Sequence, residues 1–155
     1  MNGDRLFAGG IDNDIKVFNI AESKQEEVIK GHIDTVSGLS LSFDGTYLLS
    51  SSFDETMRIW DIRSSVNPEN RFKKTLSGFV QGSEKVLIRG GWSVDGLYAC
   101  CGSADKCVYI WDITTRKIVQ RLGGHSGTVV QAVMGKNNWL ASCSNDKNVI
   151  VSQLP

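Results

Sequence analysis

The chain has 155 residues, 41% of them hydrophobic, which is enough for one packed domain. Lys and Arg together number 17, as do Asp and Glu, so the formal net charge is zero, which argues against a protein that grips nucleic acid chiefly by neutralising phosphates and against a polybasic membrane anchor. No apolar run approaches the roughly 18 residues of a membrane span, and the N-terminal segment does not resemble a signal peptide.

Short stretches rich in β-branched and aromatic residues alternate with Gly, Asn, Asp and Ser along the whole chain, which is typical of many short strands. Four of these stretches align with one another: Phe7 to Ile20, Leu48 to Ile62, Tyr98 to Ile113 and Leu140 to Leu154. In each, an Asp stands six residues before the position of a Trp-Asp pair: Asp12 before Phe18, Asp54 before Trp60, Asp105 before Trp111, and Asp146 before Ser152. This position recurs at steps of 42, 51 and 41 residues, which is the range expected for the blades of a β-propeller.

Each repeat has further internal order. Two of them open with a Gly-His pair, Gly31-His32 and Gly124-His125. An apolar strand follows, and then a two-residue turn: Asp44-Gly45, Asp95-Gly96 or Asn137-Asn138. In such a turn we expect both residues to take positive φ. A second strand leads to the repeated Asp, a third ends at Trp-Asp and a looser fourth follows, so one repeat predicts the four antiparallel strands of a propeller blade.

The third repeat carries extra length, with a polar connector from Arg63 to Ser77, Gly78-Phe79 in place of Gly-His, and a second polar stretch from Gln81 to Lys85. The first repeat lacks its opening strand and the last lacks its closing strand. We therefore predict an all-β chain of about three and a half propeller blades, at approximately 1–30, 31–77, 78–122 and 123–155. We expect the open blade edges to favour self-association, as a head-to-tail dimer that closes the ring.

One constellation has the composition of a hydrolase site, because His32, Ser50 and Asp54 are expected to converge beside Trp60. The same positions recur, however, as His125, Ser142, Asp146 and Ser152, and in degraded form as Phe79, Cys101, Asp105 and Trp111. A catalytic triad is not built once per blade, whereas buried polar groups in every blade need partners. We interpret these residues as structural tetrads, and no G-x-S-x-G motif supplies an exposed nucleophile.

Other candidate sites are weak. The four cysteines, Cys100, Cys101, Cys107 and Cys143, form no C-x-x-C pair, so we predict buried reduced thiols and no zinc site. Glycine-rich segments such as Arg89-Gly90-Gly91 do not have the spacing of a phosphate-binding loop. The sequence therefore predicts no catalytic residue, no metal ligand and no cofactor.

Function is then expected at the surface, on the loops that join blades and carry the repeated Asp. Interfaces favour aromatic and long side chains. Our candidates for a partner surface are Phe53, Phe79, Gln81, Lys85 and Lys106. Phe79 is the strongest candidate, because it stands where a tetrad histidine would be.

The Trp-Asp ends, Gly-His starts, Asp-Gly turns and regularly placed Asp residues resemble the WD-repeat (WD40) family across the whole chain. Stretches that go beyond what a blade requires, GGIDNDIKV and GSADKCVYIWD, resemble the spliceosomal branch of that family found in the U5 small nuclear ribonucleoprotein. That resemblance implies a seven-bladed ring, a nuclear scaffold in pre-mRNA splicing, and protein partners among the U5 components, including the large core U5 protein, with RNA contacted at most indirectly. The alternatives are a WD40 adaptor of another assembly, such as a ubiquitin-ligase receptor or a chromatin reader, and more remotely a Ser/His/Asp hydrolase.

Overall fold

The structure is a computed structural model that describes residues 4–154. The first sheet contains β1 (Arg5–Gly9), β2 (Ile15–Asn19) and β3 (Lys24–Ile29). The second contains β4 (Val36–Leu41), β5 (Tyr47–Ser52), β6 (Thr56–Asp61) and β7 (Phe72–Ser77). The third contains β8 (Gly90–Trp92), β9 (Tyr98–Cys101), β10 (Val108–Asp112) and β11 (Ile118–Leu122). The fourth contains β12 (Val129–Met134), β13 (Trp139–Ser144) and β14 (Val149–Gln153).

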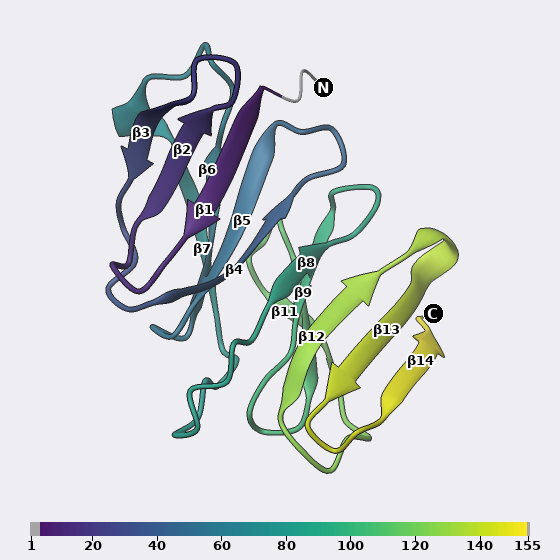
Figure 1. Ribbon diagram of the computed structural model, residues 1–155. Coiled ribbons are helices and arrows are strands. Elements are labelled where there is room, and N and C mark those ends of the chain that lie inside the picture. The colour runs from purple at the N-terminus through teal and green to yellow at the C-terminus, as the bar shows by residue number, and fades with distance from the viewer. Residues whose placement is uncertain (1–3, 155) are drawn as a thin grey trace.

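Within every sheet the strands are antiparallel and lie in chain order, and the four sheets follow one another along the molecule (Figure 1). The innermost strands bring neighbouring sheets together, because β4 contacts β1 and β8, and β8 contacts β12. Two short 3-10 helices, at Pro68–Asn70 and Lys136–Asn138, lie in connections. The predicted all-β architecture of about three and a half propeller blades is confirmed. Among the described residues, no helix is long and apolar enough to cross a membrane.

Three hydrophobic cores lie at the three junctions between sheets. Alternation along the strands creates them: in β2, for example, Ile15 and Val17 are buried whereas Lys16 between them is not. The first core includes Ile15, Val17, Ile29, Leu48 and Trp60; the second includes Leu49, Met57, Leu76, Phe79 and Trp111; the third includes Cys100, Val108, Ile110, Val129 and Leu140. Each sheet is therefore stabilised by its neighbours and not by a core of its own.

The turns between strands lie on two opposite faces of the molecule. The connections β4–β5, β8–β9 and β12–β13 lie at one end of the sheets, at the top of Figure 1, and we call this end the hairpin face. The turns that carry the repeated Asp and the connections between sheets lie at the opposite end, which we call the loop face.

The prediction of two-residue turns with both residues at positive φ is wrong at Asp44-Gly45 and Asp95-Gly96. There the loops span 42–46 and 93–97, and only Gly45 and Gly96 have positive φ, at 70° and 72°. The physical reason is that each Asp side chain closes a wider turn by accepting the hydroxyl hydrogen of a Ser two residues earlier. At Asn137 and Asn138 both residues do have positive φ.

Candidate functional site

The second sheet brings together His32, Ser50, Asp54 and Trp60. The imidazole Nδ1 of His32 lies 2.8 Å from Asp54 Oδ2, and its Nε2 lies 2.7 Å from Ser50 Oγ. The indole N–H of Trp60 donates to the same Ser50 oxygen at 2.8 Å. Gly31 makes this approach feasible, because a Cβ at that position would lie 2.7 Å from a carbon of the Trp60 ring. The four side chains tie β5, β6, their turn and the β3–β4 connection into one unit.

The network determines where the protons lie. The Asp54 carboxylate can only accept, so Nδ1 of the neutral imidazole carries the hydrogen and Nε2 accepts from the Ser50 hydroxyl. Burial lowers the pKa of His32, and the neighbouring Asp54 only partly opposes this. The pKa of Asp54 is also lowered: burial works to raise it, but hydrogen bonds from Thr56 and His32 prevail. The group is therefore a neutral imidazole beside a carboxylate.

The same residues do not have the layout of a working hydrolase site. Ser50 has 0% exposure and His32 has 7%, so no substrate carbonyl reaches the hydroxyl. The Ser50 oxygen also accepts an indole N–H, which lowers its electron density where a nucleophile needs it. The arrangement fits a structural clamp.

The fourth sheet repeats the clamp with three members. His125 Nδ1 lies 2.9 Å from Asp146 Oδ2, and His125 Nε2 lies 2.9 Å from Ser142 Oγ. Burial works to raise the pKa of Asp146, but the backbone N–H groups of Ser126 and Asn148 and the His125 side chain lower it to about 2. The chain has Ser152 at the place of the tryptophan, so the Ser142 hydroxyl receives no indole N–H.

In the third sheet the structure does not bring Asp105 and Trp111 into one network. Asp105 accepts from the Tyr109 hydroxyl at 2.6 Å and from the Arg121 guanidinium at 2.8 Å. The indole N–H of Trp111 donates instead to a backbone carbonyl, that of Ser77. Phe79 packs edge-on against Trp111, with ring centroids 6.4 Å apart. A tyrosine and an arginine thus supply the hydrogen bonds that Asp105 would otherwise accept from a histidine.

Two of the predicted partner-surface residues are not at the surface. Phe79 is 2% exposed and belongs to the second core, and Gln81 is 4% exposed. Phe79 is buried because apolar contact with Trp111 replaces the missing imidazole, so losing the histidine did not free the position for a partner. Gln81 is buried in the β7–β8 connection, where its backbone N–H donates to the Glu55 carboxylate of the β5–β6 turn at 2.9 Å and its side-chain amide donates to the Val86 carbonyl. The expectation that these two side chains are exposed was wrong.

The other three candidates lie on the loop face. Lys85 is exposed, with its ammonium 5.5 Å from the centroid of the half-buried Phe53 ring and 3.4 Å from Asp34 Oδ2. Lys106 is exposed at the tip of the β9–β10 turn. Phe53 and Lys85 therefore form one ordered patch across the second sheet and the β7–β8 connection.

Sequence reasoning missed two exposed aliphatic residues on the same face. Ile11, in the β1–β2 turn, is 88% exposed, and Ile33, in the β3–β4 connection, is 80% exposed. Both stand on anchored backbone, since the Val36 N–H donates to the Gly10 carbonyl and the Ile33 N–H donates to Asp54. For Ile11 the available signal was an isoleucine inside a turn otherwise made of Gly, Asp and Asn.

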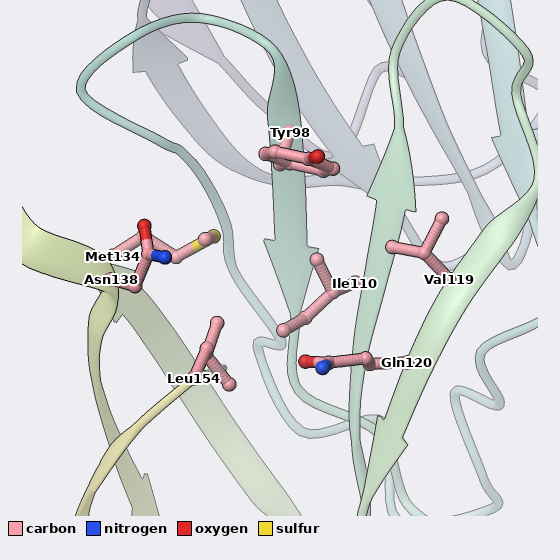
Figure 2. Close-up of a pocket in the computed structure, with 7 residues that line it drawn as sticks. All are labelled: Tyr98, Ile110, Val119, Gln120, Met134, Asn138 and Leu154. Atoms are coloured by element: carbon pink, nitrogen blue, oxygen red, sulfur yellow. The ribbon is translucent and has the colours of Figure 1, made fainter.

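A cavity of about 210 Å³ opens between the third and fourth sheets (Figure 2). It is lined by Tyr98, Ile110, Val119, Gln120, Met134, Asn138 and Leu154. Several of these side chains belong to the third core or pack against it. The volume is below the ~300–1,000 Å³ of ligand pockets, so we interpret it as packing space. Within residues 4–154, no group of three or more His, Cys, Asp or Glu residues could hold a metal ion.

The family description "WD domain, G-beta repeat" matches residues 23–61, 73–112 and 116–151. The chain belongs to the WD40 repeat family. Each matched range opens near the start of an outer strand, β3, β7 or β11, and closes at the end of, or within, the third strand of the next sheet. A WD40 repeat in the sequence is thus shifted by one strand from the sheet in the structure, so each repeat links two sheets covalently.

Curated relatives match over nearly the whole chain. The human U5 small nuclear ribonucleoprotein 40 kDa protein is 41% identical over 152 residues, which are 97% of this chain and 42% of the relative. The protein of the same name from Dictyostelium discoideum is 43% identical over 98% of this chain and 55% of the relative. Pre-mRNA-splicing factor cwf17 of Schizosaccharomyces pombe is 33% identical over 98% of this chain and 44% of the relative. The chain spans about half the length of these relatives.

Proposed function

We propose that this chain is a protein-interaction scaffold of the U5 small nuclear ribonucleoprotein and acts in pre-mRNA splicing. The observation that carries the proposal is the 41% identity over 97% of the chain to a U5 subunit. A WD40 scaffold alone requires only the turns, the repeated Asp and the core. Identity at this level over this length includes surface residues, and a shared surface supports shared partners.

The clamps support a role without chemistry of its own. The His, Ser and Asp side chains that resemble a triad are buried and committed to one another. The described residues hold no cluster of metal ligands. The splicing chemistry would therefore belong to other components of the particle, while this chain positions them.

Protein partners fit the surface better than RNA does. The net charge is zero, and Lys85 on the loop face is paired with the Asp34 carboxylate. Binding of a nucleic-acid backbone needs several unpaired basic side chains. We propose that the loop face, with Ile11, Ile33, Phe53 and Lys85, contacts the large core U5 protein, that RNA contact is at most indirect, and that the chain is nuclear.

Affinity purification of the tagged chain from nuclear extract tests the proposal, with mass spectrometry and RNA sequencing of the recovered material. We expect U5 RNA and the large core U5 protein. A matched pair of variants localises the contact: Ile33→Asp on the loop face should reduce recovery, whereas Leu97→Asp on the hairpin face should not. Recovery of a ubiquitin ligase or a chromatin complex in place of U5 components would overturn the assignment.

A further inference from the structure

The hairpin face carries two grooves that repeat at the spacing of the sheets. The first, of about 270 Å³, lies between the β4–β5 and β8–β9 hairpins. Its lining residues are Ser42, Phe43, Asp44, Tyr47, Trp92, Val94, Asp95 and Gly96. The second, of about 350 Å³, lies between the β8–β9 and β12–β13 hairpins. The three hairpins that flank the two grooves lie at the upper end of the sheets in Figure 1.

The two grooves share one plan and differ in charge. Each has a tyrosine from the first residue of a second strand, Tyr47 or Tyr98, opposite the last residue of the next sheet's inner strand, Trp92 or Met134. The first groove is lined by two carboxylates and no cation. In the second groove, Lys136 and Asn137 stand where the first has Val94 and Asp95.

The aromatic lining of the first groove combines enclosed and exposed rings: Trp92 is 9% exposed, Tyr47 is half-buried and Phe43 is exposed. The Tyr47 and Trp92 rings lie 6.5 Å apart at a tilt of 36°, and the Trp92 indole N–H is occupied by the Ser40 carbonyl. Phe43 is 73% exposed at the tip of its hairpin. These rings offer π-faces, and the Trp92 N–H is already used within the fold, which favours a cationic or apolar group as the ligand.

The carboxylates have capacity left for a ligand. Asp95 Oδ1 accepts from the Ser93 hydroxyl and the Leu97 N–H, but Oδ2 has no hydrogen-bond or ion-pair partner in the part of the chain that the structure describes. Asp44 is held by Ser42 and Thr46, which lower its pKa and keep it charged. A nearby cation, Arg63, is already bound to Asp61 through two nitrogens at 2.9 and 2.6 Å. The groove therefore has negative charge that no cation in its lining neutralises.

We propose that the groove between the β4–β5 and β8–β9 hairpins binds an arginine side chain of a protein partner, an inference that rests on the proposed function only in taking that partner to be a protein. A guanidinium is planar, stacks on aromatic rings and gives five N–H donors to carboxylates. The groove is smaller than a typical ligand pocket and suits one side chain. A lysine side chain has no planar cation to stack on the rings, and a phosphate would be repelled by the two carboxylates.

The test is a titration of the intact chain with N-acetyl-arginine amide, followed by the NMR signals of the Trp92 indole N–H and the Gly96 amide. N-acetyl-lysine amide and N-acetyl-citrulline amide, the neutral isostere, are the reference probes. We expect arginine to shift both signals with at least five-fold higher affinity than lysine, and citrulline to bind at least ten-fold more weakly than arginine. Phe43→Ala and Asp44→Asn should each weaken arginine binding about five-fold.

A gain-of-function variant guards against effects of misfolding. Lys136→Val with Asn137→Asp gives the second groove the charge of the first, so arginine should then also shift the Tyr98 and Gly135 amides. Three outcomes would each overturn the proposal. They are an affinity for citrulline or lysine equal to that for arginine, shifts confined to other surfaces, and no binding of arginine. The titration needs no spliceosomal component, so its result is independent of the recovery of U5 proteins from extract.

Discussion

The indole N–H of Trp111 donates to the backbone carbonyl of Ser77 at 3.0 Å. Its counterpart one sheet earlier, Trp60, donates to the side chain of Ser50. The difference follows from two substitutions within the tetrad, since the third sheet has Phe79 and Cys101 where the second has His32 and Ser50. Without a hydroxyl to accept it, the Trp111 N–H is satisfied by backbone, which any sequence supplies.

Restoring the clamp in the third sheet should reveal how its members depend on each other. Phe79→His alone places an imidazole in an apolar core beside Cys101, and we expect a loss of about 2 kcal/mol in the free energy of unfolding. Cys101→Ser alone buries an extra hydroxyl and should also destabilise. Together the two new groups can bond each other, so the double variant should be more stable than the sum of the singles predicts, by about 1 kcal/mol. Urea unfolding measures all three, and strict additivity would show that no clamp forms.

The two histidine clamps should differ in their sensitivity to loss of serine. Ser50→Ala leaves both His32 Nε2 and the Trp60 indole N–H without a partner in the buried interior, and at ~1–3 kcal/mol for each unsatisfied group we expect a loss of about 3 kcal/mol. Ser142→Ala leaves only His125 Nε2 unpaired, so we expect about half that loss. Urea unfolding at neutral pH is the measurement. Equal losses of unfolding free energy in the two variants would contradict the explanation by the number of unsatisfied buried groups.

Acidification should destabilise the chain in two steps. Because burial lowers the pKa of His32 below its ordinary 6.5, the unfolded state binds a proton first, so this contribution is fully present above about pH 6.5 and is lost as the pH falls through the folded pKa. The Arg63 guanidinium lowers the pKa of Asp61 to about 2 from 3.8, so its contribution is present above about pH 4 and is lost toward pH 2.

Urea unfolding between about pH 7.5 and pH 2 separates the two steps. His32→Gln should remove the dependence below pH 6.5, whereas Asp61→Asn should leave that step unchanged and reduce the loss below pH 4. An unchanged step near pH 6 in the His32 variant would show that another group titrates there.

The exposed valines of β14 lead to an expectation of self-association. Val149 is 68% exposed and Val151 is 60% exposed, and within the described residues β14 pairs only with β13. An open apolar edge templates pairing with another chain. Sedimentation velocity should therefore show concentration-dependent dimers that Val151→Lys weakens, while Leu97→Lys on the hairpin face has no effect. A monomer at every concentration would refute this expectation.

The fold could be predicted from the sequence because its signals are local. The repeated Asp, the Trp six residues later and the Gly-His pair all lie within one or two strands of each other, and each has a hydrogen-bond partner that the same repeat supplies. The period of the repeats then determines the number of sheets. This local pattern alone was enough to predict the clamp around His32.

The surface could not be predicted in the same way, because exposure depends on contacts distant in sequence. The connection that contains the buried Gln81 is held by a hydrogen bond from the Gln81 backbone N–H to Glu55, 26 residues earlier, and no local pattern predicts this contact. The groove at Tyr47 and Trp92 likewise joins two different sheets. A repeat describes one unit, whereas these features belong to pairs of units.

The burial of Ser50 gives a final prediction on the hydrolase alternative. A fluorophosphonate needs an accessible hydroxyl that a base can deprotonate, and the Ser50 side chain is fully enclosed with its oxygen accepting the Trp60 N–H. We expect mass spectrometry to find no adduct on Ser50 in the folded chain, in a reaction where an added serine hydrolase is fully labelled. Stoichiometric labelling of Ser50 that His32→Gln abolishes would establish an activated nucleophile. It would also mean that the clamp opens in solution, because the closed geometry leaves no path for a phosphorus centre to reach the hydroxyl.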